Sequence, residues 1–378
     1  MIYNNIEKFE DKNFAYFCKF NGNTGQERLF VSDDYNTLYK DSEGFLEGEV
    51  YDLINKNEFI PACATYSLAN YFNNIYEKEK YPYFYYMIPE RSYKSNIERK
   101  SFKTVSLKSN YNDISMSLKI KELIERIRAG ELLQVVISRE FYLKNIDFKR
   151  LLSSFINNDS SLYVYYYKFG DTRIIGSSPE NVFTINNNII NVRPIAGTRR
   201  RGSDEYDDKI LENELLNNEK EKLEHRMLLD LARNDLGRIC EPGTVNVDYS
   251  MKIEKFLTVQ HMVSSVTGKT NASLRDIFAS VFPAGTVSGA PKKRAMELIN
   301  KYEDNIRKEY AGAIGIISKD YTDMALVIRT IFSHDNVVTA RAGAGIVKDS
   351  IPEDEVNEMF SKAMTVMGDY YEESVDNR

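Results

Sequence analysis

Cysteine and histidine are scarce in this chain of 378 residues, which has three of each. The cysteines, Cys18, Cys63 and Cys240, lie far apart and form no CxxC pair. This pattern argues against a disulfide framework, and it does not provide the paired ligands of a zinc site. Cysteines kept apart in this way fit a reducing compartment, so we expect a cytoplasmic protein.

The chain also lacks long apolar runs and an excess of basic over acidic residues. No apolar run reaches the ~20 residues that a membrane-spanning helix needs. The opening residues, MIYNNIEKFEDKN, lack the basic start and apolar core of a signal peptide. A net charge of -6 gives no electrostatic footprint for nucleic acid. We therefore expect neither membrane nor nucleic acid as a partner, and an anionic substrate would need a local positive site.

What the chain does contain is typical of a globular protein. It is 42% hydrophobic and 28% charged, and its length allows one large domain or two ordinary ones. Residues 1–110 show short apolar runs between polar turns, without evident chemistry. Residues 95–112, rich in Ser, Lys, Asn and Glu, are interpreted as a connection. We expect an amino-terminal subdomain over 1–110 and a catalytic domain over 111–378.

Secondary-structure patterns become clearer after residue 115. Strands paired through hairpins, with helices outside them, favour an α+β fold with antiparallel sheets. The patterns predict a helix that ends at Gly130, strands over 134–139 and 173–175, a hairpin over 182–192, a long charged helix over 208–235, a helix over 291–302, strands over 312–317, 324–332 and 337–341, and a helix over 352–367.

Two acidic pairs stand three residues apart on expected helices. Glu221 and Glu224 form one pair, and Glu355 and Glu358 form the other. Carboxylates at this spacing share a helix face, and such a run is commonly a solvated surface that pairs with lysines. If the two helices face each other, the four carboxylates can instead bind one hard divalent cation. Carboxylates together with water suit Mg²⁺.

A possible anion site lies between these pairs in the sequence. Arg329 falls in an apolar strand pattern, where a charge is costly unless it is paired. It can bind an internal Asp or Glu, or a ligand carboxylate through a bidentate contact. Gly343, Ala344 and Gly345 form either a tight turn with positive φ or a row of backbone N–H groups for an anion. The combination predicts an enzyme for an acidic small molecule.

The segment PAGTVSGAPK over 283–292 precedes an expected helix and could be mistaken for a phosphate loop. Gly285 and Gly289 are too close together for a Walker motif, and Pro291 interrupts the lysine position. Nucleotide binding is therefore not expected.

Nine segments, taken together and in order, resemble the signature of the chorismate-utilising enzymes. They cover about residues 115–370, and the resemblance implies a large antiparallel two-sheet core flanked by helices. The segments are GELLQVVISR, GSSPENVF, RPIAGTRRRG, NEKEKLEHRMLLDLARNDLGR, VQHMVSSVTG, FPAGTVSGAPKKRAM, YAGAIGIIS, IRT and RAGAGIVKDSIPEDE.

The resemblance implies roles for the acidic pairs and for the anion site. Glu224 and Glu358 would ligate Mg²⁺, Glu221 and Glu355 would act through water, and the metal would hold the ring carboxylate of chorismate. The residues expected around the enolpyruvyl carboxylate are Tyr310, Arg329, Gly343, Ala344 and Gly345, with Lys362 nearby.

The resemblance also implies an acid. Glu180 matches the glutamate that protonates the departing ring hydroxyl, and His261 and Thr286 match residues that line this hydroxyl. Hydroxide is a poor leaving group, so a carboxylic acid must protonate it, and a cation must neutralise the substrate carboxylate. Glu180 would then need a raised pKa, which an environment that excludes water provides.

The expected nucleophile is ammonia. Family members that add water have a lysine base at the position that Gln134 occupies here. Many members that form aminodeoxychorismate have a lysine at the position of Ala196, which precedes Gly197 and Thr198. Neither lysine is present, so we expect anthranilate and pyruvate as products. No glutaminase triad is visible, so a separate glutamine amidotransferase subunit would supply the ammonia. The alternatives are an aminodeoxychorismate-forming enzyme and a non-catalytic binding subunit that retains the fold.

Overall fold

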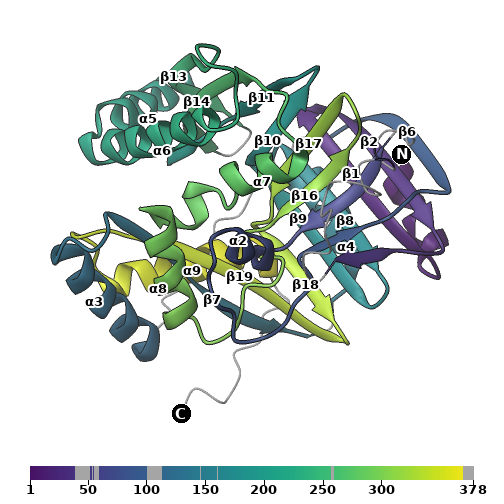
Figure 1. Ribbon diagram of the computed structural model, residues 1–378, viewed down its shortest axis with the longest axis horizontal. Coiled ribbons are helices and arrows are strands. Elements are labelled where there is room, and N and C mark those ends of the chain that lie inside the picture. The colour runs from purple at the N-terminus through teal and green to yellow at the C-terminus, as the bar shows by residue number, and fades with distance from the viewer. Residues whose placement is uncertain are drawn as a thin grey trace.

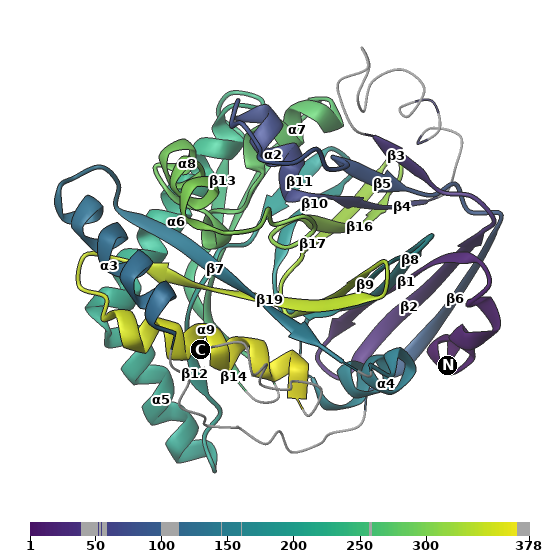
Figure 2. The same cartoon turned by 90° about the horizontal axis from the view of Figure 1, so that it is seen from below.

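The computed structural model describes residues 1–38, 52, 54, 59–99, 113–144, 146–159, 161–256 and 259–368. Two large antiparallel sheets lie at its centre, and helices cover their outer faces (Figure 1 and Figure 2). This arrangement confirms the expected α+β fold with an antiparallel two-sheet core.

Sheet A contains nine strands among the described residues. It includes three strands that precede residue 100. In spatial order the strands are β15 (Gly289–Ala290), β7 (Gln134–Leu143), β19 (Val337–Ile346), β18 (Thr330–His334), β9 (Thr172–Ser178), β8 (Tyr163–Phe169), β1 (Asn13–Asn21), β2 (Thr24–Ser32) and β6 (Arg91–Glu98).

Sheet B contains ten strands in the described ranges, and it too is extended by strands that precede residue 100. Segments on both sides of the expected boundary at residue 110 therefore pair in both sheets, and the boundary itself lies outside the described residues. In order the strands are β12 (Ile195–Arg200), β14 (Val259–Lys269), β11 (Ile189–Val192), β10 (Asn181–Asn186), β17 (Tyr321–Leu326), β16 (Ala313–Ile317), β4 (Ile60–Ala64), β5 (Phe84–Tyr86) and β3 (Asn36–Leu38), with β13 (Asn246–Lys255) paired to β14.

Helices cover the sheets and build a lobe at one end. In Figure 1 this lobe comprises α5 and α6 together with β13 and β14. The helices are η1 (Ile2–Phe9), α2 (Tyr66–Phe72), α3 (Ile114–Arg128), α4 (Phe148–Asn158), α5 (Glu205–Asn217), α6 (Glu219–Gly237), α7 (Leu274–Val281), the short η2 (Gly285–Val287), α8 (Lys292–Tyr302) and α9 (Pro352–Met367).

Local sequence explains where several elements begin and end. The Asp113 side chain accepts a hydrogen bond from Met116 N and caps α3, and Gly130 follows the helix with φ +81°, as expected. The hairpin between β10 and β11 turns on Asn187 and Asn188, which both have positive φ. These expectations are confirmed.

Strand β8 shows how the two sheets pack. Alternate side chains of a strand point to opposite faces, yet all of its tyrosines are buried. Tyr166 stacks on Phe148 of α4 at the outer face. On the inner face, Tyr167 donates to the carbonyl of Gly315 in sheet B, at 2.8 Å. Aromatic rings thus fill the space between the sheets while their hydroxyls form hydrogen bonds.

Asp323 of β17 joins the two sheets by polar contacts. Its carboxylate accepts hydrogen bonds from Tyr163 of β8 at 2.6 Å and from Tyr321 of its own strand at 2.7 Å. Lys19 of β1 forms an ion pair with it at 2.5 Å. The Asp323 side chain is 1% exposed, so these three donors compensate for the cost of burying its charge.

Three expectations about elements are wrong. The single helix over 208–235 is two helices, because Asn218 leaves the helical conformation and caps α6 by accepting from Glu221 N. The single strand over 324–332 is two strands in different sheets, since β17 ends at Leu326 and β18 begins at Thr330. The glycine-rich segment 343–345 lies inside β19 and is not a turn.

Replacing Asp323 by Asn should destabilise the fold by about 2–3 kcal/mol, because one amide oxygen cannot accept from three donors and the amide NH₂ would face them. Urea unfolding of the variant measures this change. Asp320 is exposed on the same hairpin and provides the control, and its change to Asn should alter stability by less than about 0.5 kcal/mol. Equal effects of the two substitutions would contradict the bridging role of Asp323.

Candidate functional site

Glu180 and Arg329 each lie where the chain passes from one sheet to the other. Glu180 stands between β9 of sheet A and β10 of sheet B, and Arg329 stands between β17 of sheet B and β18 of sheet A. Leu326 N donates to the carbonyl of Glu180 at 2.9 Å, and Ser177 N donates to that of Arg329 at 3.1 Å. These hydrogen bonds hold the two crossings side by side.

The Arg329 side chain is available for a ligand. The residue has φ +50°, an uncommon conformation outside glycine that often marks a functional position. Its guanidinium has no hydrogen-bond or ion-pair partner among the residues that the structure describes. Of the two expected partners, the internal carboxylate is therefore not found, and a ligand carboxylate remains.

Glu180 is a buried carboxyl group, 7% exposed. Thr286 of η2 donates to its Oε1 at 2.7 Å. Burial raises the pKa of Glu180 to about 8, although the Thr286 hydrogen bond and the charge of Arg329 oppose this rise. Glu180 is therefore protonated at neutral pH and can donate a proton.

A small cavity of about 30 Å³ adjoins Glu180. Its walls come largely from apolar side chains of β10, α6 and α7, among them Val182, Leu228 and Val281, and Thr286 also lines it. This volume holds about one water molecule, so the surroundings of Glu180 are nearly dry.

His261 of β14 is buried close to the same guanidinium. Its Nδ1 lies 2.9 Å from Thr198 Oγ1, and its Nε2 has no partner in the described part of the chain. Burial and the charge of Arg329 lower its pKa to about 4, so the imidazole is neutral at pH 7. His225 has a different role: its Nε2 lies 2.6 Å from Ser264 Oγ and ties α6 to β14.

Strands β7 and β19 bring Gln134, Tyr310 and the glycines together. A Cβ at Gly343 would lie 3.0 Å from the Tyr310 hydroxyl, and one at Gly345 would lie 2.7 Å from Gln134 Nε2. Ala344 is buried between the two glycines. Glycine is therefore needed at these positions because neighbouring atoms come close to the backbone, and not because φ is positive. The expected tight turn is wrong. The Oε1 atom of Gln134 is buried without a partner among the described residues.

The acidic pairs occupy α6 and α9. Burial raises the pKa of Glu224, and the carboxylates of Glu221, Glu355 and Glu358 raise it further against the opposing charge of Lys220. The acids of α9 thus lie within electrostatic reach of Glu224 on α6. Four mutually repelling carboxylates form a donor set that suits a hard divalent cation.

The four carboxylates are nevertheless not gathered into a coordination shell. Across the described ranges, no three His, Cys, Asp or Glu side chains lie close enough to hold a metal. Lys362 lies 2.6 Å from Glu358 and also donates to the carbonyl of Gly343. Arg199 lies 3.2 Å from Glu221, and Ser350 donates to Glu355. Mg²⁺ binding at these acids stays a prediction.

The bulge in β12 lies beside Glu221 and Leu215. The register of β12 against β14 shifts between Ala196 and Thr198, and Gly197 between them has φ +73°. A Cβ at Gly197 would lie 3.0 Å from Glu221 Oε2. Glycine is therefore required both by the backbone conformation and by the closeness of the acid.

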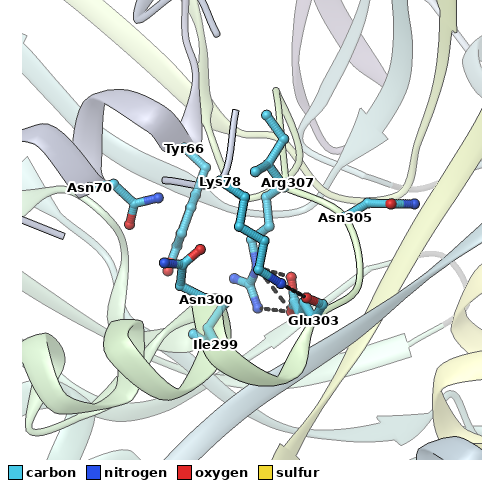
Figure 3. A pocket seen from close by; sticks show the side chains of 9 residues that line it. Tyr66, Asn70, Lys78, Ile299, Asn300, Glu303, Asn305 and Arg307 are labelled. Atoms are coloured by element: carbon cyan, nitrogen blue, oxygen red, sulfur yellow. Dashed lines mark hydrogen bonds and ion pairs between the residues drawn. The ribbon is translucent and has the colours of Figure 1, made fainter. Parts of the chain in front are cut away.

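Sequence reasoning missed a buried ionic cluster, which consists of Glu303, Arg307 and Arg341. Arg307 lies between the ring of Tyr66 and the carboxylate of Glu303, and Lys78 reaches the Glu303 carbonyl (Figure 3). The four-residue spacing of Glu303 and Arg307 could have indicated an ion pair between them. In a sequence, however, this spacing is typical of an exposed pair on a helix. The cavity beside the cluster measures about 10 Å³, too little for a substrate.

None of the helices in the described ranges is both long enough and apolar enough to cross a membrane.

Comparison with known proteins identifies the family. A family model described as chorismate binding enzyme matches residues 44–368. The chain belongs to the chorismate binding enzyme family. The resemblance seen in the sequence motifs is thereby confirmed.

Two similar curated relatives carry the same name. Anthranilate synthase component 1 of Saccharolobus solfataricus is 46% identical over 265 residues, which cover 69% of this chain and 63% of that protein. The protein of the same name from Aquifex aeolicus is 43% identical over 274 residues, which cover 71% of this chain and 54% of that protein. The match thus spans between about half and two thirds of the length of these relatives.

Solved structures share the fold over nearly the whole chain. Anthranilate synthase component I from Streptococcus pneumoniae TIGR4 has a TM-score of 0.75 at 28% identity, with 94% of this chain and 92% of that chain covered. The menaquinone-specific isochorismate synthase from Escherichia coli has a TM-score of 0.75 at 19% identity, with 94% and 87% covered, and shows the fold alone.

The carboxyl group of Glu180 should titrate near pH 8. Infrared difference spectra against Glu180→Gln, recorded across pH, report its protonation. Thr286→Val and Arg329→Gln should each move the midpoint to higher pH, because each removes a group that stabilises the carboxylate. A midpoint near the ordinary value for glutamate, about 4.3, would contradict the description of this site.

Proposed function

We propose that this chain is a magnesium-dependent enzyme that converts chorismate and ammonia to anthranilate and pyruvate, with ammonia supplied by a glutamine amidotransferase subunit. The observation that carries the proposal is a neutral carboxylic acid, Glu180, held beside a guanidinium, Arg329, that has no partner in the described part of the chain. Relatives named anthranilate synthase component 1, at 43–46% identity, support it.

The acid serves the first bond cleavage. Nitrogen would attack the ring carbon next to the one that carries the carboxylate, while the ring C–O bond breaks and Glu180 protonates the hydroxyl that leaves as water. The ring carbon that carries nitrogen then loses its proton while the enolpyruvyl C–O bond breaks, which leaves the aromatic ring of anthranilate. The enol that departs takes up a proton and becomes pyruvate. Chorismate and ammonia thus balance against anthranilate, pyruvate and water. Since Glu180 must be protonated, activity should fall as the pH rises through about 8.

Charge complementarity would orient the substrate. Arg329 would bind the enolpyruvyl carboxylate together with the Tyr310 hydroxyl and the backbone of β19 at Gly343 and Gly345. Bound Mg²⁺, held by Glu224 and Glu358 directly and by Glu221 and Glu355 through water, would neutralise the ring carboxylate. The neutral imidazole of His261 would accept or donate one hydrogen bond at the leaving hydroxyl.

The choice of ammonia rests on two side chains. Gln134 has no basic atom, so it cannot activate water as a lysine would. Ala196 has no amine that could attack the ring. Ammonia would therefore be supplied separately. None of the three cysteines, all within the described ranges, is among the residues assigned to the site: Cys18 and Cys63 are buried in the core, and the partly exposed Cys240 follows α6.

Product analysis tests the proposal directly. The chain with chorismate, ammonium and Mg²⁺ should form fluorescent anthranilate, and a chelator should stop the reaction until Mg²⁺ is restored. Glu358→Gln should lower the rate by about 100-fold or more without a change in thermal unfolding, because a direct ligand is lost. Glu353 is exposed on the same helix, and Glu353→Gln is the matched control, with unchanged rate.

If aminodeoxychorismate is the only product, the chain is an aminodeoxychorismate-forming enzyme. The absence of any turnover would favour a non-catalytic binding subunit. Full activity in Glu358→Gln would contradict the metal assignment.

A lysine at position 134 should open the reaction to water. In Gln134→Lys the new amine, on a stem one bond longer, would reach past the position where Gln134 Nε2 now lies against Gly345 and could accept a proton from water. Chromatography of the products should then detect isochorismate or salicylate. Gln134→Met, which has a similar shape and no base, should not form them. An unaltered product spectrum in the lysine variant would overturn the role given to this position.

A further inference from the structure

The cluster of Glu303, Arg307 and Arg341 is almost completely buried, with exposures of 4%, 5% and 4%. Arg307 and Glu303 meet at 2.7 Å, and Arg341 lies 3.6 Å from the same carboxylate (Figure 3 shows the first pair). A buried ion pair contributes little net stability, since hydrophobic residues of similar volume often do as well. Fold stability alone therefore does not account for these three charges.

The remaining donors of Arg307 reach two elements of the proposed site, one short helix and one strand. Its Nη1 donates to the carbonyl of Val287 and its Nη2 to that of Val136, both at 2.7 Å. Val287 directly follows Thr286, which donates to Glu180, and Val136 lies two residues after Gln134. One guanidinium thus ties η2 to β7.

The same cluster fixes the turn that carries Tyr310. Lys308 and Ala311 flank Tyr310 closely, and both have positive φ, at +52° and +60°. Such a turn persists only where its surroundings hold it. Arg341 of β19 donates to the carbonyls of Ile306 and Asn305, at 2.7 and 2.9 Å. The cluster therefore connects the Tyr310 turn to the strand that contains Gly343.

We propose that Arg307 is a positioning residue, which holds Thr286 against Glu180 and sets Gln134 and Tyr310 relative to them. The inference rests on the proposed function, because it concerns the geometry of the group assigned there as the proton donor. A rigid support of this kind has catalytic value, since small displacements of a reacting group lower the rate strongly.

Arg307→Lys tests the proposal. Lysine keeps the charge but, as a single ammonium on a flexible stem, cannot reach both carbonyls and Glu303 at once. Thr286 should then bond Glu180 less well, and the infrared titration midpoint of Glu180 should rise by about half a pH unit or more. With chorismate and ammonium, kcat should fall about tenfold while KM for chorismate changes less than about threefold.

Arg99→Lys is the matched control. Arg99 is 3% exposed and donates to the carbonyls of Asp159 and Ser161, far along the chain from any proposed site residue. The two variants should lose similar thermal stability. Only Arg307→Lys should move the Glu180 midpoint. Equal midpoints in the two variants and the parent would overturn the proposal.

The route through Thr286 can be isolated. The other charged or titratable groups near Glu180 are Arg329, together with Arg193 and Asp235, which line the adjoining cavity. Arg307→Lys leaves all of them in place. In a Thr286→Val background it should cause no further rise of the midpoint, because the hydrogen bond is already absent. An additional rise of the same size would refute this route.

Two further provisions keep the outcomes distinct. If Arg307→Lys does not fold, Glu303→Gln is measured in its place, because the amide weakens the ion pair but can still accept a hydrogen bond from Arg307. A Glu180 titration midpoint equal to that of the parent would then overturn the proposal. The infrared titration requires no turnover. A parent that forms no anthranilate would therefore reject the proposed function, whereas an unmoved midpoint would reject only the role of Arg307.

Discussion

The hydrogen bonds between two sheet crossings are the constraint on which the site depends. Each sheet supplies one strand before a crossing and one after it, and the backbone bonds at Glu180 and Arg329 lock the crossings together. A carboxyl group and a guanidinium so placed would ordinarily form an ion pair. Here the acid stays neutral because it is buried, and the guanidinium lacks a partner among the described residues. The fold thereby keeps a neutral acid and a guanidinium close together without an ion pair between them.

Much of the fold could be predicted from local patterns. The capped helix before Gly130 and the asparagine hairpin follow from residue types whose backbone preferences are strong. The split of the strand around Arg329 could not be predicted, because an apolar run does not show that its two halves belong to different sheets. The break at Asn218 was missed for a related reason: a single capping residue inside a charged helical pattern is easily read as part of the helix.

The residue types of the candidate site could be predicted from the sequence. The distances and contacts between their side chains could be predicted much less. The motifs brought Glu180, Thr286 and His261 to attention, and the structure adds that Thr286 donates to Glu180 while His261 is neutral. The acids of α9 influence Glu224 of α6 electrostatically, while lysine and arginine side chains lie within ion-pair distance of three of the four carboxylates. The i,i+4 spacing already allows the pairs of Lys220 with Glu224 and of Lys362 with Glu358, whereas the contact of Arg199 with Glu221 depends on the tertiary structure. The spacing of Glu303 and Arg307 was visible as well, but the sequence did not show that this pair is buried.

The central claim is that Glu180 carries a proton at neutral pH beside an arginine that is free for a ligand. Neutron diffraction from deuterated crystals grown at pH 7 would locate that proton directly. The account predicts a deuteron on one Glu180 oxygen, with the other oxygen accepting from Thr286. Two bare carboxylate oxygens facing Arg329 in an ion pair would contradict it.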